Sequence, residues 1–169
     1  AGTRAWQFAS GHVASAPGTN GAESAVYVVN ETGSLYALNA SSGAVLYGPV
    51  SLGATGIYGT PTWHGNGPRL YLSSKGGKVY ALDPATGDTA AGWSGPITIG
   101  QPSNPVVFNQ GLYVGSSDGN LYEYAITSGA QTGVRAVGST VGDPVVDAYL
   151  WRIYAGAADG RIYAFTTPF

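Results

Sequence analysis

Apolar and polar positions follow a pattern that occurs four times along the chain. Each copy has two short runs of aliphatic, β-branched and aromatic residues on either side of a tight turn, and the clearest copy is Leu112–Tyr122, which turns at Asp118-Gly119. An Asp-Gly pair between two apolar runs is among the strongest short-range signals of a β-hairpin. The equivalent hairpins occupy residues 26–36, 70–80 and 153–163. The pattern therefore predicts an all-β chain made of four copies of one hairpin.

The spacing of the four hairpins is nearly constant. Their turn glycines lie 44, 42 and 41 residues apart, at Gly33, Gly77, Gly119 and Gly160. A period of about 40–45 residues built of short strands is typical of β-propeller blades. In each copy an X-Pro step precedes the hairpin, and proline suits the start of an inner strand because it cannot donate to a ladder. A second turn and an outer strand follow, so each repeat predicts a four-stranded blade.

The two ends of the chain depart from the repeat in complementary ways. After Tyr163-Ala164-Phe165 at the end of the fourth hairpin only residues 166–169 remain, too few for a turn and an outer strand, whereas the alternating segment Arg4–Phe8 precedes the first repeat. We predict one β-propeller domain over residues 1–169, with repeats at about 10–50, 54–97, 98–138 and 139–169, the last completed by residues 4–8. This pairing closes a ring of four blades without an open edge. The alternative is half of a ring of about eight blades, completed by a second copy or by further sequence.

Composition narrows the classes of partner. The net charge is −2 and the seven basic residues are scattered singly, so we expect no nucleic-acid partner. No run approaches the ~18 apolar residues of a membrane span. Charged residues make up 9% of the chain, against about 25% in average soluble domains, and this favours a secreted, periplasmic or cell-surface protein. Because methionine is absent even at position 1, we expect a processed chain or a piece of a longer one.

Residue types that carry catalysis or bind metals are sparse. Cysteine is absent, which excludes a thiol nucleophile and thiolate metal sites. The histidines His12 and His64 occupy different places in their repeats, and each Asp-Gly turn offers one carboxylate where calcium needs about six to eight oxygens. We therefore predict no enzyme activity, no cofactor and no metal site.

Two groups of residues are candidates for binding. The residues before the repeat prolines should gather at one mouth of the central channel, and three of them are polar: Thr60, Asn104 and Asp143. Convergent oxygens can hold a small ligand or ion there, or they can simply satisfy nearby backbone amides. The second group holds aromatic residues outside the repeat register, which we predict to form an exposed recognition patch: Tyr58, Trp63, Tyr149 and Trp151. In contrast, eight tyrosines in register are predicted to be core: Tyr27, Tyr71, Tyr113, Tyr154, Tyr36, Tyr80, Tyr122 and Tyr163.

The segments Val114–Tyr122 and Tyr80–Gly87 resemble the pyrroloquinoline-quinone-type (PQQ-like) β-propeller repeat, and the resemblance extends over nearly the whole chain. This repeat occurs in quinoprotein dehydrogenases, outer-membrane assembly lipoproteins and sensor domains of membrane kinases. In the family's tryptophan-docking pattern Trp93 lies two residues late, and in the third copy Glu123 and Ala125 replace the usual Ala and Asp. The dehydrogenases use an adjacent cysteine pair over the quinone. Because this chain has no cysteine, we expect no quinone cofactor here.

Together these features predict a non-catalytic, exported or cell-surface propeller that binds a protein partner or assembles with copies of itself. One alternative is a propeller that binds carbohydrate through the out-of-register aromatic residues, or a small ligand at the channel mouth. The other is a fragment of a quinoprotein dehydrogenase.

Overall fold

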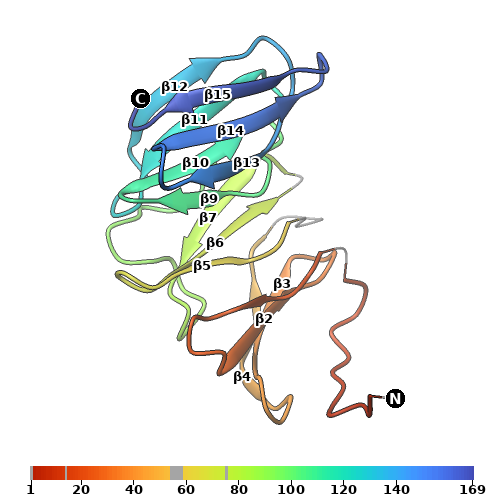
Figure 1. The fold of residues 1–169 in the computed structure, drawn as a ribbon. Helices are drawn as coiled ribbons and strands as arrows, with labels where there is room; N and C mark the ends of the chain where they lie inside the picture. Colours follow the sequence, from red (N-terminus) through yellow and green to blue (C-terminus); the bar gives the residue numbers. More distant parts are fainter. Residues whose placement is uncertain (1, 14, 54–58, 75) are drawn as a thin grey trace.

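The computed structural model describes residues 2–13, 15–53, 59–74 and 76–169. These residues form four antiparallel sheets, three with four strands and the last with three, and none of them is helical. Figure 1 shows the sheets one after another in chain order, with the first and the last at opposite ends of the molecule. The predicted all-β architecture of blade repeats is confirmed.

We number the sheets as blades 1 to 4. Blade 1 consists of β1 (Gly18–Thr19), β2 (Ala25–Val29), β3 (Ser34–Asn39) and β4 (Val45–Ser51). Blade 2 consists of β5 (Thr62–His64), β6 (Arg69–Ser74), β7 (Lys78–Leu82) and β8 (Ile97–Thr98). Blade 3 consists of β9 (Val106–Phe108), β10 (Gly111–Gly115), β11 (Asn120–Ala125) and β12 (Gln131–Ala136). Blade 4 consists of β13 (Val141–Asp147), β14 (Arg152–Ala157) and β15 (Ile162–Thr166).

The four hairpins share one register. The first tyrosine of each lies opposite the residue after its second tyrosine, in the pairs Tyr27–Ala37, Tyr71–Ala81, Tyr113–Glu123 and Tyr154–Ala164. The turn glycines all have φ between 77° and 89°, the left-handed region that glycine enters without steric cost. Turn chemistry and register thus agree in all four copies.

The core lies between the blades. Three clusters of buried residues fill the junctions of blades 1 and 2, 2 and 3, and 3 and 4. Strand β10 is buried at every position, because blades 2 and 4 cover its two faces. This explains why the hairpin strands do not alternate between apolar and polar residues.

Blade 2 departs from the prediction at its outer strand. We expected this strand near Trp93, but the paired residues are Ile97 and Thr98, and Trp93 lies in the preceding loop. The Trp93 indole is 7% exposed, and its Nε1 donates to the carbonyl of Ile126 in blade 3 at 2.9 Å. Because Trp93 lies in the long loop between β7 and β8, it is not paired in the sheet, and its side chain packs on blade 3 instead.

The predicted strand at residues 4–8 is not seen. This segment has no ladder partner among the described residues and lies against blade 1. The Trp6 indole Nε1 donates to the carbonyl of Ala40 at 2.9 Å, and the ring of Phe8 meets that of Tyr36 edge-on at 5.2 Å. These contacts hold the segment at the end of the molecule away from β15 (Figure 1). Closure of the last blade by residues 4–8 thus stays a prediction.

Candidate interaction surface

Thr60 and Asn104 each lie two residues before an inner strand, β5 and β9, whereas Asp143 is the third residue of the inner strand β13. Asp143 accepts two hydrogen bonds from Asn104, one from its backbone N–H at 2.8 Å and one from its Nδ2 at 2.7 Å. The side chain of Asn104 in turn lies against Gly59, which directly precedes Thr60. The structure therefore brings Asn104 and Asp143 into contact. Thr60 lies beside them, because its neighbour Gly59 packs against the Asn104 side chain.

The contacts of Asp143 favour a structural role over a ligand site. One of its carboxylate oxygens holds the backbone amide of Asn104, so the pair fastens blade 3 to blade 4. Thr60 is exposed, and the link between blades 2 and 3 is made two residues later, where the Thr62 hydroxyl donates to the carbonyl of Pro105 at 3.1 Å. A ligand at this channel mouth stays a prediction.

Of the out-of-register aromatic residues that the structure describes, Trp63 lies apart from Tyr149 and Trp151. Trp63 is half-buried and packs on the core between blades 1 and 2, close to Gly21 and Gly65. Tyr149 and Trp151 lie on the turn between β13 and β14 of blade 4 and are 91% and 50% exposed. Tyr58 lies outside the described residues.

The turn between β13 and β14 presents three consecutive apolar side chains, which we call the blade 4 tip: Tyr149, Leu150 and Trp151. Leu150 is 47% exposed. The Asp147 carboxylate caps the turn by accepting the backbone N–H groups of Tyr149 and Leu150, each at 2.9 Å. Sequence reasoning missed Leu150, although three apolar residues in a turn position are the signal that would have found it.

Trp151 has a backbone conformation that is unusual for a bulky residue. Its φ is 55°, in the left-handed region, where the equivalent turn of blade 3 has Asn109 and that of blade 2 has Gly67. A non-glycine residue there costs of order 1–3 kcal/mol unless its side chain stabilises the turn locally, as Asn and Asp do. The Trp151 carbonyl accepts the backbone N–H of Thr167 at 3.0 Å, and this bond helps to hold the conformation. Backbone strain of this kind is concentrated at functional sites.

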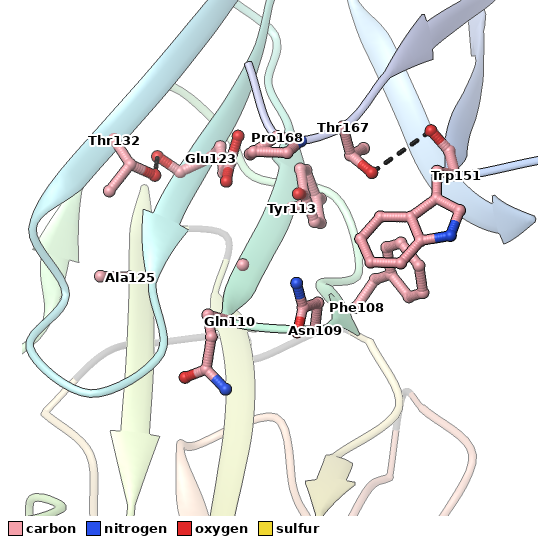
Figure 2. A pocket seen from close by; sticks show the side chains of 11 residues that line it. Phe108, Asn109, Gln110, Tyr113, Glu123, Ala125, Thr132, Trp151, Thr167 and Pro168 are labelled. Carbon is pink, nitrogen blue, oxygen red and sulfur yellow. Dashed lines mark hydrogen bonds between the residues drawn. The ribbon is translucent and has the colours of Figure 1, made fainter. Parts of the chain in front are cut away.

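Beside the tip lies a pocket of about 260 Å³ between blades 3 and 4. Figure 2 shows the indole of Trp151 against Phe108 on one side, with Gln110 and Asn109 below and Glu123 and Thr132 on the opposite side. The Trp151 and Phe108 rings meet at 5.3 Å and 71°, an edge-to-face contact. The pocket is therefore walled by aromatic rings and edged by amide, hydroxyl and carboxylate groups.

Glu123 gives this pocket a carboxylate that the other blades lack. The equivalent positions are Ala37, Ala81 and Ala164. Glu123 is 5% exposed, and its Oε2 accepts the backbone N–H of Phe169 at 2.7 Å. Burial raises the pKa of the neighbouring Tyr113 to about 12, and the negative charge of Glu123 adds to the rise. The Tyr113 phenol therefore stays neutral at physiological pH.

Other chemistry is sparse in the described part of the chain. No group of three or more His, Asp or Glu side chains is placed to hold a metal ion there. The same residues hold no helix of the length and apolarity that a membrane crossing takes.

Comparison with known proteins identifies the repeat. The family model described as outer membrane protein assembly factor BamB matches residues 1–168. The predicted resemblance to the PQQ-like repeat is confirmed. A search of curated protein sequences finds no match.

Solved structures share the fold at low sequence identity. BamB from Moraxella catarrhalis has a TM-score of 0.80 and 21% identity, with 95% of this chain and 49% of that chain covered. The computationally designed Ika4 protein has a TM-score of 0.78 and 13% identity, with 99% and 100% covered. BBS1N, solved in complex with ARL6DN, has a TM-score of 0.67 and 17% identity, with 91% and 51% covered. The chain thus spans about half the length of the Moraxella protein and all of the designed one.

Proposed function

Because the chain belongs to the family of outer membrane protein assembly factor BamB, we propose that it is a non-catalytic, exported module that binds a protein partner. The observation that carries this proposal is the blade 4 tip, Tyr149-Leu150-Trp151, whose three apolar side chains are between 47% and 91% exposed. Aromatic residues grouped at a rigid, exposed position are the usual anchors of protein interfaces. Asp147 fixes the tip by capping its backbone.

The pocket beside the tip supplies the depth that an interface anchor needs. Its volume of about 260 Å³ accommodates one large side chain of a partner beside the packed rings of Trp151 and Phe108. Gln110 and Thr132 line the same pocket and can bond to a partner's backbone. The partner segment that fits best thus presents an apolar side chain flanked by free backbone donors or acceptors.

The relatives support this class of function. The family is described as an assembly factor, and BBS1N was crystallised with another protein, ARL6DN. Both descriptions concern protein association and neither concerns a reaction. Export fits the low charge of the chain and the description of the family as an outer membrane protein assembly factor.

A peptide-display selection tests the proposal. A random peptide library is selected on the immobilised 169-residue chain and counter-selected on the Trp151→Asn variant. Asparagine tolerates the left-handed conformation, so this variant removes the indole while keeping the turn. Leu46→Ser is the matched control, because Leu46 is 55% exposed on blade 1, away from the tip.

We expect enriched peptides with an aromatic or aliphatic anchor. By calorimetry they should bind the parent chain and Leu46→Ser equally and bind Trp151→Asn at least tenfold more weakly. Unchanged circular dichroism shows that the variant is folded. If no peptide is enriched, or if the enriched peptides bind Trp151→Asn as tightly as the parent, the tip is not a protein-binding surface.

The exposed ring of Tyr149 also suits stacking on a sugar, and this ring is the observation that favours the carbohydrate-binding alternative. A glycan array probed with the parent chain and with Tyr149→Ser separates the two. If the parent chain binds a glycan, Tyr149→Ser does not, and no peptide binds, then the partner is a carbohydrate and not a protein.

A further inference from the structure

We propose that two copies of this chain join head to tail into a ring of eight blades, in which residues Arg4–Phe8 of each copy supply the outer strand of blade 4 of the other. The inference goes beyond the proposed function, because the joining surfaces are the two end faces of the chain and not the blade 4 tip. It uses only contacts that recur between the blades of one copy.

The first observation is that Trp6 docks on blade 1 as Trp93 docks on blade 3. Trp93 Nε1 donates to the carbonyl of Ile126, and Trp6 Nε1 donates to that of Ala40, both at 2.9 Å. Ile126 and Ala40 are equivalent, since each lies three residues before the turn glycine that follows the third strand. Trp6 thus makes the contact that a preceding blade makes with the blade after it.

The turn glycines give the same answer independently. A methyl group added to Gly129 would lie 3.0 Å from the Trp93 ring, and one added to Gly43 would lie 2.6 Å from the Trp6 ring. At the equivalent Gly87 the nearby ring is that of Tyr47, which is on β4, the outer strand of blade 1. Residues 4–8 therefore lie where the segment after the third strand of a preceding blade would lie, the place held by β4 of blade 1 and by the loop before β8 of blade 2.

The last blade is the one that lacks such a strand. Strand β15 pairs with β14 only among the described residues, whereas β3, β7 and β11 each pair with an outer strand. An open strand edge offers unpaired backbone groups to another segment. The vacant edge and the displaced strand are thus complementary, but Figure 1 shows them at opposite ends of one copy.

The outward face of blade 4 is apolar and uncovered. Ile162 is 79% exposed, although its equivalents Leu35, Val79 and Leu121 are all 0% exposed. Val145 on the same face is 62% exposed, and Tyr154 is half-buried where Tyr27, Tyr71 and Tyr113 are buried. This face has the residue types of an interior junction without the following blade.

The leading face of blade 1 is hollowed where a preceding blade would pack. A pocket of about 240 Å³ lies between the N-terminal segment and blade 1, lined on one side by Trp6 and Phe8 and on the other by Val26, Val28 and Leu38. In blade 2 the equivalents of Val26 and Val28 are Leu70 and Leu72, which are 0% exposed because Tyr27 and Leu35 of blade 1 pack in the same cluster.

The two faces should pack as adjacent blades pack within one copy. Tyr154 and Ile162 of the second copy are the residues that fill the pocket at Val26 and Val28. The Tyr27 and Tyr71 hydroxyls donate to Pro84 and Ile126 of the following blade, at 3.2 and 3.3 Å. By the same rule the Tyr154 hydroxyl of the second copy meets Ala40, beside Trp6.

A second copy is the occupant that satisfies both faces at once, because each copy offers one face of each kind. The shared lengths agree with this. The chain covers 100% of the designed Ika4 protein and 49% of BamB, so the same arc of blades occurs as a whole chain and as half of a longer one. Two junctions related by a two-fold axis then close the ring without a free edge.

Light scattering on the 169-residue chain tests the proposal first. We expect a mass twice the 17.2 kDa of one chain over a range of protein concentrations. Ile162→Glu should reduce the mass to that of one chain with unchanged circular dichroism, because the side chain is exposed in a single copy. Tyr149→Ser, also exposed but on the tip, is the matched control and should keep the double mass.

Chemical cross-linking then tests which segments meet. The chain has no cysteine, so a variant carrying Gln7→Cys and Tyr163→Cys has two thiols only. A short bismaleimide should join them between copies, giving a product of twice the chain mass on a denaturing gel. The same variant with Ile162→Glu should give none.

A single-chain mass for the parent protein overturns the proposal, and so does a mass other than two chains. A double mass that Ile162→Glu leaves unchanged overturns the assigned interface. A cross-link within one chain overturns the exchange between copies in favour of a four-bladed ring. None of these results bears on peptide binding at the tip, so the two proposals fail separately.

Discussion

The junction between blades 3 and 4 and the outward face of blade 4 place the same repeat positions in opposite surroundings. Leu121 is 0% exposed in the first and Ile162 is 79% exposed in the second, although each lies near the start of the third strand of its blade and directly precedes a tyrosine. The difference comes entirely from the presence or absence of a following blade. Whether a hairpin residue is buried thus depends on the blade that packs against it, and each blade is stabilised by the blades that cover its faces.

Leucine-to-alanine substitution in the covered junction should have the largest effect. Leu121→Ala should lower the free energy of unfolding by about 2–5 kcal/mol, because it leaves a cavity among Tyr113, Ile153 and their neighbours. Ile162→Ala should cost less than about 0.5 kcal/mol in dilute protein and more as concentration rises, because only association buries it. Denaturant unfolding at several concentrations measures both. Equal, concentration-independent losses would mean that the two positions do not differ as described.

Trp93 and Trp6 make the same indole hydrogen bond in two places, Trp93 at the junction of blades 2 and 3 and Trp6 on the free face of blade 1. Trp93→Phe should cost about 1–3 kcal/mol, because the indole is buried and its Nε1 bond to Ile126 is lost. Trp6→Phe loses the equivalent bond to Ala40 from a half-buried ring and should cost about 0.5–1.5 kcal/mol. Thermal unfolding of the two variants gives the order. A larger loss at Trp6 would show that the N-terminal segment is anchored more firmly than a junction.

Alkaline pH probes the junction tyrosines. Burial raises the pKa of Tyr71 from 10.0 to about 12, and Arg69 opposes the rise slightly. Between these values the unfolded chain releases this proton and the folded chain keeps it, so the contribution to stability is complete below pH 10 and is lost as the pH rises towards 12. Tyr71→Phe should therefore flatten the fall in stability over this range. An identical slope in parent and variant, measured by denaturant unfolding, would assign the fall to other groups.

The link at the channel mouth should have a smaller effect than the covered junctions. Asp143→Ala removes two hydrogen bonds to Asn104 at an exposed position and should cost about 1 kcal/mol. Calcium should leave the melting temperature of the parent chain unchanged if the pair only joins the blades. A rise in melting temperature with calcium that Asp143→Ala abolishes would instead establish an ion site there.

The sequence predicts the repeat well because each hairpin is specified locally. Turn glycines at a constant spacing and tyrosines in register fix where strands begin and end, and these positions agree with the structure in all four blades. The outer strand of blade 2 was misplaced because Trp93 marks a docking contact and not a ladder position. A pattern of residue types does not distinguish these two uses of an aromatic side chain.

The binding surface was harder to predict, because it depends on which blades meet. Trp63 and Trp151 are both out of register, yet one packs on the core and the other is half exposed. The pocket beside Trp151 depends on Glu123 and Phe108, which lie on blade 3, and sequence alone does not show that these residues face the blade 4 tip. Similarly, exposure of Tyr154 and Ile162 depends on a covering blade and not on their own positions.

Hydrogen exchange at β15 tests most directly the claim that the two ends of the chain are halves of one junction. If residues 4–8 of a second copy pair with this strand, the β15 amides that face away from β14 will be protected as strongly as those of β11 in the parent chain. In Ile162→Glu the same amides will exchange rapidly while β11 stays protected. Rapid exchange of these amides in the parent chain at every protein concentration would contradict the account.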